Sequence, residues 1–535
     1  MNNSFNTPPV YNNPYVSQPS PVITTPREAR KYSLRENLFA WMCYIFAYLF
    51  CLAVPISVNP LGAFIVIILM FVSTAVVLLI KGNKVQTMPI VVAVSALVCS
   101  SSLILTSNSF LHFFAFCYGL ASYCYFVYGV SSEHKFKFND MLLADFMKAL
   151  FVLPFYSFAD VFRALFSGKN NKGGRFALKV LCGIVLAIVP TAIVLLLLAY
   201  DNDFANLMEK MFKFENISLF EHIVSLIFAF PVSAYLYGIF ISSRDNKCTD
   251  ILTPESCKKG LKSLRFAPLV TVLCAVMPVL FVYVVFFVSQ WKYYVSGFTR
   301  VLPKNFSYAT YAREGFFELC TVAFINLIIL ILISVFLKRK SEKSPVMLKV
   351  LSVIFSVFTL ILISTAIAKM VMYIDCYGLT PKRVYSSWFM IVLALVFLLI
   401  IVKQFVHKMN LIAYSFASVV VLFTALCVSN VDSFIANYNV NRYLDGTLKT
   451  VDVESLEELQ DASIPSMVRL YEKLLPMPYD DMSESEKDMF YELERYLDIK
   501  GENLKRRDDF GNKDIWSYTI PSQRAEIALK ETKFY

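Results

Sequence analysis

Charged residues are scarce in this chain, and their scarcity excludes an ordinary soluble domain. Only 17% of the 535 residues are Asp, Glu, Lys or Arg, whereas a soluble protein of this size has about a quarter. Hydrophobic residues make up 57%. They gather in runs of about twenty, the length of helix that crosses a hydrocarbon layer of roughly 30 Å.

Motifs that carry catalysis or metal binding are also lacking. The chain has no Walker loop, no zinc-protease helix motif and no nucleophile elbow. The four histidines have no metal-ligand spacing, and most of the twelve cysteines lie inside apolar runs, as small buried hydrophobes do. The sequence therefore predicts no catalytic residue, no metal and no cofactor, and it favours a non-enzymatic protein.

Residues 1–35 lack the apolar core of a cleavable signal peptide. They are rich in Asn, Pro, Ser, Thr and Tyr and end in a basic run. This composition predicts a disordered tail, and its positive charge predicts that the tail is cytoplasmic. The basic residues are Arg27, Arg30, Lys31 and Arg35.

The long apolar runs predict an all-α fold, a polytopic transmembrane helical bundle over residues 36–429. In lipid the backbone must satisfy its own hydrogen bonds, and runs such as 61–80 and 317–337 are too long for barrel strands. We expect about eleven spans. These are 37–57, 61–80, 88–107, 110–129, 178–199, 217–241, 266–289, 316–337, 347–371, 386–404 and 410–429.

Segment 141–166 is apolar but contains Asp145, Lys148, Asp160 and Arg163. Four charges in one run favour an interfacial or re-entrant segment over a further span. If the segment did cross the bilayer, every later part of the chain would change sides.

The distribution of charge predicts the orientation. Lys and Arg dominate the links 130–177, 242–265 and 338–349, which the positive-inside rule assigns to the cytoplasm. Residues 430–535 instead carry 22 acids and 14 bases, a net charge of −8. We expect a multi-pass protein of the cell membrane with a cytoplasmic N-terminus and an extracytoplasmic C-terminal domain.

Residues 430–535 predict a small, soluble helical domain. Asp452 or Ser455 can cap a first helix, and Pro465 can open a second over Ser466–Leu475. Ser483 and Glu486 form a capping-box pattern for a helix to about Leu497. A last helix is predicted from 522 to 533, and the apolar stripes of these helices either bury internally or dock on the membrane part.

Three spans carry a proline near their centre, Pro190, Pro231 and Pro278. Proline removes a backbone hydrogen bond and can kink a helix, and broken helices occur in transporter sites. Proline is also commoner in membrane helices generally, which is the simpler interpretation.

Two charged strings on the predicted outer side are candidate functional segments. Arg313, Glu314 and Glu318 lie at a helix start, where both carboxylates share a face and the helix dipole favours anions. Asp375 and Arg383 flank a turn with Gly378 and Pro381, and they are placed to pair across it. The simpler interpretations are an anchored helix start and a plain connecting turn.

These strings resemble a bacterial family of membrane proteins. The resemblance covers roughly residues 90–530 and implies a domain of unknown function (family four-one-seven-three, and relatives), with no established activity. It adds Asn439 and Arg442 to the candidate cluster. The matching segments are Tyr311–Leu319, Tyr377–Thr380 with Arg383, Asn430–Arg442, Asp203–Ala205, and Trp516 with Arg524 and Ala525.

Three functions remain open at this point. The first is a membrane component or scaffold that presents the C-terminal domain to an envelope or protein partner. The second is a transporter or lipid-handling protein, and the third is an intramembrane transferase. Membrane lipids are the expected contacts of the bundle, and nucleic acid is not expected, because the basic excess sits in short links between spans.

Overall fold

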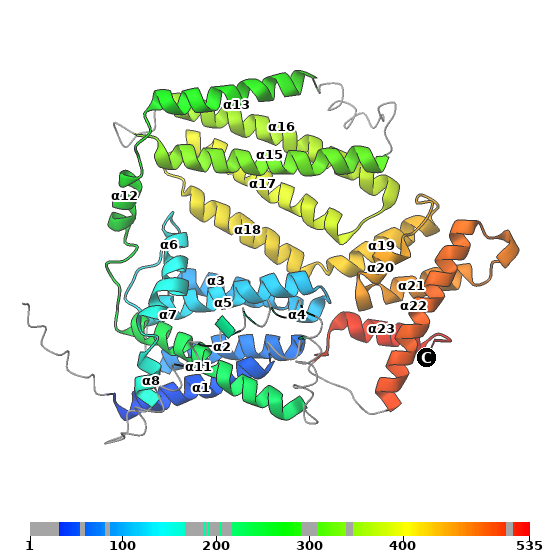
Figure 1. Cartoon of the computed structure of the whole chain (residues 1–535), viewed down its shortest axis with the longest axis horizontal. Coiled ribbons are helices and arrows are strands. Elements are labelled where there is room, and N and C mark those ends of the chain that lie inside the picture. Colours follow the sequence, from blue (N-terminus) through cyan, green and yellow to red (C-terminus); the bar gives the residue numbers. More distant parts are fainter. Residues whose placement is uncertain are drawn as a thin grey trace, which may run out of the picture.

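We analysed a computed structural model of the whole chain (Figure 1). The described residues form helices and no β-strand, apart from one isolated β-bridge between Ala267 and Leu337. The predicted all-α fold is therefore confirmed. The described residues are 32–53, 59–80, 86–165, 217–289, 308–338, 346–509 and 517–534, with isolated positions between 183 and 204.

Eight helical segments in the described part are long and apolar enough to cross a membrane. Two further predicted spans are also helices, and the predicted span 178–199 lies mostly outside the described residues. Pro190 is one of its few described positions and is helical and exposed. The helices of the bundle are α1 (Leu34–Ala53), α2 (Pro60–Ile80), α3 (Thr87–Ser100), α4 (Ser102–Leu105), α5 (Ser109–Ser131), α11 (Ile217–Arg244), α13 (Leu269–Ser289), α15 (Tyr308–Phe336), α16 (Val346–Tyr377), α17 (Pro381–Phe405) and α18 (Leu411–Val428).

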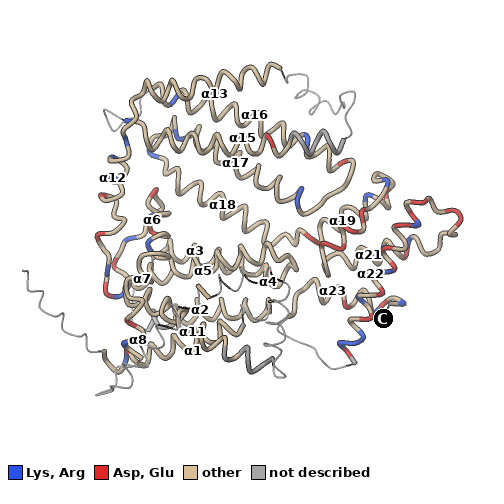
Figure 2. The backbone as a smooth tube through the Cα atoms, viewed as in Figure 1, with Lys and Arg blue, Asp and Glu red and all other residues tan. Residues whose placement is uncertain are grey.

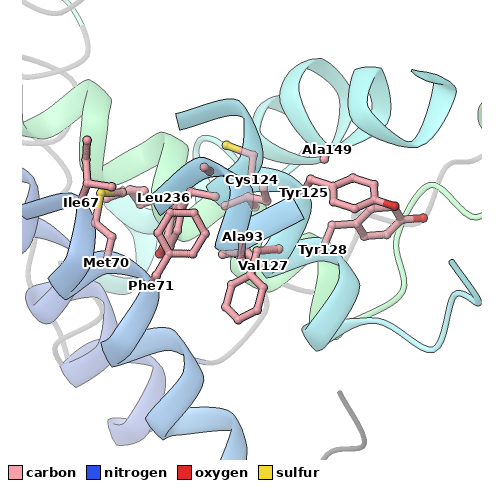
Figure 3. Close-up of a cluster of buried hydrophobic side chains, with 14 of the residues drawn as sticks. Ile67, Met70, Phe71, Ala93, Cys124, Tyr125, Val127, Tyr128, Ala149 and Leu236 are labelled. Atoms are coloured by element: carbon pink, nitrogen blue, oxygen red, sulfur yellow. The ribbon is translucent and has the colours of Figure 1, made fainter. Parts of the chain in front are cut away.

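The bundle has two halves that lie side by side (Figure 1). In the first half α1 packs on α11, and α5 packs on α2, α3 and α11. Figure 3 shows its core, where Ile67, Met70 and Phe71 of α2 meet Cys124 and Val127 of α5. In the second half α15, α16, α17 and α18 pack in chain order, and α18 also contacts α3, which joins the halves.

The segment predicted to be re-entrant or interfacial is divided into four consecutive elements, of which the first three form one continuous helical run over residues 142–156. Neither this run nor the last element is long enough to cross a bilayer. All four lie at the end of the bundle where α1 begins (Figure 1). The pieces are α6 (Leu142–Met147), the π-helix η1 (Lys148–Val152), α7 (Leu153–Tyr156) and α8 (Asp160–Leu165).

The C-terminal domain is helical, and its predicted caps are confirmed. The side chain of Asp452 accepts a hydrogen bond from the backbone N–H of Ser455 at 3.0 Å, and Ser483 and Glu486 form their reciprocal pair. The helix after Ser483 runs to Asp509, beyond the predicted end at Leu497. The elements are α19 (Val431–Leu444), α20 (Val453–Glu457), η2 (Gln460–Ala462), α21 (Ile464–Leu474), η3 (Tyr479–Asp481), α22 (Glu484–Asp509) and α23 (Ile520–Lys530).

In the described part of the chain most charged residues lie at the two ends of the bundle. Figure 2 shows the long bundle helices almost free of charged residues, with charges gathered around α12 (Pro254–Ser263) at one end and over the C-terminal domain at the other. The start of α1 lies at the α12 end (Figure 1). The apolar middle is therefore bounded by two polar ends, as in a membrane-spanning bundle.

Candidate functional site at the junction of the bundle and the C-terminal domain

A tight turn connects α16 to α17 at the end of the bundle that bears the C-terminal domain. Gly378 follows α16 in the left-handed conformation, with φ +74°, and its N–H donates to the carbonyl of Ile374 at 2.9 Å. This is the usual glycine stop of a helix. Thr380 then caps α17, and Pro381 occupies its first turn. Glycine and proline thus fix the turn locally, as the sequence predicts.

The buried side chain of Asn439 holds this turn against α19. Its Oδ1 accepts from the N–H of Leu379 at 2.7 Å, and its Nδ2 donates to the carbonyl of Leu379 at 2.8 Å. Asn439 is 6% exposed. These two hydrogen bonds fix both the position and the orientation of the turn relative to α19, because losing either one would leave a buried polar group unpaired.

Arg442, one turn further along α19, binds the last turn of α16. Its guanidinium donates to the carbonyl of Ile374 at 3.2 Å and to that of Asp375 at 3.0 Å. It also donates to the carbonyl of Thr447. The end of a helix carries unpaired carbonyls and partial negative charge, so a cation there is favourable.

Arg383 reinforces the same turn from α17. Its guanidinium donates to the carbonyls of Tyr377, at 2.9 Å, and Gly378. It also lies over the ring of Tyr373, 4.0 Å from the ring centre, which is a cation–π contact. The predicted residues Arg383, Asn439 and Arg442 therefore meet at one place, and Asp375 contributes its backbone carbonyl there.

A second connection between bundle and domain involves Asp432 in the first turn of α19. Asn108 donates to its carboxylate at 3.1 Å. The Oδ1 of Asn108 accepts the N–H groups of Phe110 and Leu111 and so caps α5. Asp432 is 2% exposed, and burial raises the pKa of its carboxyl group to about 6. The domain also shares its hydrophobic core with Leu111, Leu379 and Leu426 of the bundle.

A pocket of about 350 Å³ lies beside this turn, between the bundle and α20. Its apolar floor comes from α15 and α16, its basic wall from the start of α17, and its acidic wall from α20 and the residues beside it. We call it the junction pocket. Its lining is Phe316, Phe317, Met370, Tyr373, Thr380, Lys382, Arg383, Ser386, Asp452, Glu454, Ser455 and Glu458.

The predicted string on α15 lies next to this pocket. Phe316 and Phe317 line it, and Glu318 follows them as an exposed residue. Glu318 interacts electrostatically with Lys369, which is buried in α16. The backbone of Arg313 and Glu314 lies in α15, but their side chains are outside the described part of the chain.

Sequence reasoning missed several residues of the junction. Asn108 carries only a helix-capping signal, which gives no hint of a partner 324 residues away. Lys382 precedes the candidate residue Arg383, but no nearby sequence feature indicates that it lies opposite the acidic residues of α20. The short helix α20 was predicted from its cap, but the face that it turns to the bundle is decided by tertiary packing.

The remaining candidate prolines lie within continuous helices. α11 passes through Pro231 and α13 through Pro278. Pro231 also lines an apolar cavity of about 540 Å³ in the first half of the bundle, together with Phe50, Met70 and Tyr235. Neither proline lines the junction pocket.

Fold and site together define the class of protein: an integral, multi-pass helical membrane protein whose C-terminal helical domain is bound to the end of its bundle. Comparison with protein families matches residues 90–470 to the family described as Domain of unknown function (DUF4153), and the chain belongs to that family. No curated protein and no solved structure matches the chain.

The family comparison confirms one part of the resemblance and corrects another. A domain of unknown function is confirmed, and the matched region contains the strings around Glu318, Arg383 and Asn439. The family number four-one-seven-three was wrong, because the matching family is DUF4153. Short sequence motifs of this kind can identify the matching region and the type of protein, but they do not distinguish between similar families.

Proposed function

We propose that this protein is a non-enzymatic membrane component that presents its C-terminal helical domain, in one fixed orientation, to a protein partner or envelope ligand. One observation carries the proposal, the attachment of α19 to the turn between α16 and α17. Asn439 binds both backbone groups of Leu379, and Arg442 binds the end of α16.

A fixed domain suits recognition because it loses little orientational freedom on binding. The shared core, the bridge from Asn108 to Asp432 and the bonds of Asn439 all resist rotation of the domain on the bundle. Preorganisation of this kind raises affinity by lowering the entropic cost of association. The domain has exposed tyrosines at Tyr479 and Tyr491, which are 64% and 68% exposed. Exposed tyrosines are common in binding surfaces.

Site-specific photo-crosslinking of the full-length protein in native membranes tests the proposal. A photoreactive amino acid in place of Tyr479 or Tyr491 should give a discrete adduct of one partner. The matched control is the same amino acid in place of Phe281 of α13, which is equally exposed on an apolar helix. Adducts at the control position alone, or none at several positions across α21 and α22, would contradict a presenting role.

A transporter or lipid-handling protein is the second candidate, and the apolar cavity beside Pro231 favours it. A helix that contains proline lacks one backbone hydrogen bond and bends more easily at that position. The test is flux or lipid movement in reconstituted vesicles. Alanine at Arg313, Glu314 and Glu318 should abolish it at unchanged protein levels, and vesicles without any flux would exclude this function.

A further inference from the structure

The junction pocket combines three surfaces of different chemistry. One wall is basic, the opposite wall is acidic, and the floor is aromatic and apolar. Its lining comes from α15, α16 and α17 of the bundle and from α20 of the charged domain. A ligand that satisfies all three surfaces must carry an anion, a cation and a hydrocarbon part.

The basic wall suits an anionic oxygen. Lys382 and Arg383 lie in the first turn of α17, where the helix dipole favours negative charge. Arg383 already donates to two carbonyls of the turn. Lys382 is exposed and forms no ion pair with any side chain in the described part, so its ammonium group is available to a ligand. The hydroxyl group of Ser386, one turn later, also lines the pocket and donates to the carbonyl of Lys382.

The acidic wall suits an ammonium group. Glu454 and Glu458 are exposed, lie four residues apart and both line the pocket. Neither forms an ion pair with another described residue, whereas the carboxylate of Asp452 already caps α20. Two carboxylates on one wall attract a cation and repel a purely anionic ligand.

The floor suits the glycerol and upper acyl region of a lipid. Phe316 and Phe317 begin the apolar span of α15, Met370 lies about two turns before the end of α16, and Tyr373 lies under the guanidinium of Arg383. The volume, about 350 Å³, lies in the range of small-molecule sites. A single anion would leave the acidic wall without a partner, and a single cation would leave the basic wall without one.

We propose that the junction pocket binds the phosphoamine headgroup of a zwitterionic membrane lipid, a phosphatidylethanolamine. Its phosphate binds the ammonium group of Lys382 in the first turn of α17. Its ammonium group binds Glu454 and Glu458, and its acyl chains pass over the phenylalanines of α15 into the bilayer. The inference goes beyond the proposed function, because it assigns a small ligand to the junction and not a partner to the domain.

The test is lipid retention by the full-length protein, released from nanodiscs that contain equal amounts of phosphatidylethanolamine and phosphatidylglycerol, and counted by native mass spectrometry. We expect one retained phosphatidylethanolamine per chain. Lys382→Ala, and Glu454→Gln combined with Glu458→Gln, should each weaken retention about tenfold, as loss of a charge-assisted bond does. The controls Glu472→Gln and Lys473→Ala, at exposed positions on α21, should retain the lipid as the unchanged chain does.

Three results would overturn the proposal. The first is retention that neither pocket variant changes. The second is equal retention of both lipids that only Lys382→Ala weakens, which defines a plain anion site. The third is displacement of the lipid by an equal concentration of soluble phosphoethanolamine, which assigns the pocket to a free phosphoamine. None of these results depends on the photo-crosslinked partner, so the two proposals fail separately.

Discussion

Gly378 and Gly446 both occupy the left-handed region, with φ +74° and +71°. They differ in their surroundings, since a Cβ on Gly378 would clash with Oδ1 of Asn439, whereas a Cβ on Gly446 meets no atom within 4 Å. Gly378 is therefore needed both for its left-handed backbone and to leave space for the side chain of Asn439. Gly446 is needed only for its left-handed backbone.

This contrast predicts two different costs for the same substitution. Gly446→Ala should lower the free energy of unfolding by roughly 1 kcal/mol, the cost of the left-handed conformation. Gly378→Ala should lower it by about 2–4 kcal/mol, because it also displaces Asn439 and leaves buried backbone groups of Leu379 unpaired. Thermal unfolding of the purified chain in detergent measures both. Equal costs would show that the turn tolerates loss of the Asn439 contact.

Asp432 predicts a stability that depends on pH. Burial raises the pKa of its carboxyl group to about 6 in the folded chain, whereas an unfolded aspartate titrates near 3.9. The folded state therefore binds more protons between these values. The stability that Asp432 contributes is complete below about pH 4 and is lost as the pH rises through 6, by about 3 kcal/mol in total.

Asp432→Asn should remove this dependence. The variant should unfold at a higher temperature than the unchanged chain at pH 8, and the difference should shrink toward zero near pH 4. Melting curves across this pH range measure it, with Asp445→Asn, an exposed aspartate at the other end of α19, as the matched control. A difference that is constant with pH would contradict a buried, protonated Asp432.

At the scale of elements, α19 connects the domain to the bundle. It follows α18 after a left-handed Asn430 and then binds a turn contributed by two other helices. Its buried side combines apolar residues of the shared core with Asp432 and Asn439, and these polar residues supply the specificity of docking. Buried polar bonds define a unique arrangement because any other arrangement leaves their partners unpaired.

Asn439→Ala should loosen this attachment while the helices themselves remain folded. It leaves the buried N–H and carbonyl of Leu379 unpaired, at a cost of roughly 2 kcal/mol or more. Hydrogen exchange should become faster across 374–380, and proteolysis of 430–535 should begin earlier. Arg469→Ala is the control, because Arg469 bonds only Asn437 and Asn441 within the domain. Unchanged exchange in the turn would show that the shared core alone fixes the domain.

At the scale of the whole molecule, the two charged ends predict which parts face opposite compartments. α12, with its lysines, and the C-terminal domain lie at opposite ends of the bundle (Figure 2). The side on which each lies stays a prediction from the positive-inside rule.

Labelling of intact cells with a membrane-impermeant maleimide tests this orientation. In a chain without other cysteines, Lys473→Cys on α21 should react at once. Cys257 of α12, retained alone, should react only after the membrane is permeabilised. Both sites are at least partly exposed to solvent. Reaction of Cys257 in intact cells with protection at position 473 would reverse the topology, and equal reaction of both would contradict opposite sides.

Much of the fold could be predicted from the sequence because the deciding interactions are local. Runs of twenty apolar residues define membrane helices wherever they occur, and caps such as Ser483 with Glu486 define helix starts within one turn. The junction was predicted only in part. Arg383, Asn439 and Arg442 were recognised as candidates, but Asn108, Lys382 and Glu454 were not.

The sequence by itself determined the class of protein, the run of helices, the charge of the two ends and the turn at Gly378, since each depends on residues close together in the chain. Only the tertiary structure decided that Asn439 binds a residue 60 positions away, that Asn108 meets Asp432 across 324 positions, and that α20 forms the acidic wall of a pocket. Hydropathy and helix periodicity specify which face of a helix is buried, but the pairing of buried polar groups depends on the packing of the whole chain.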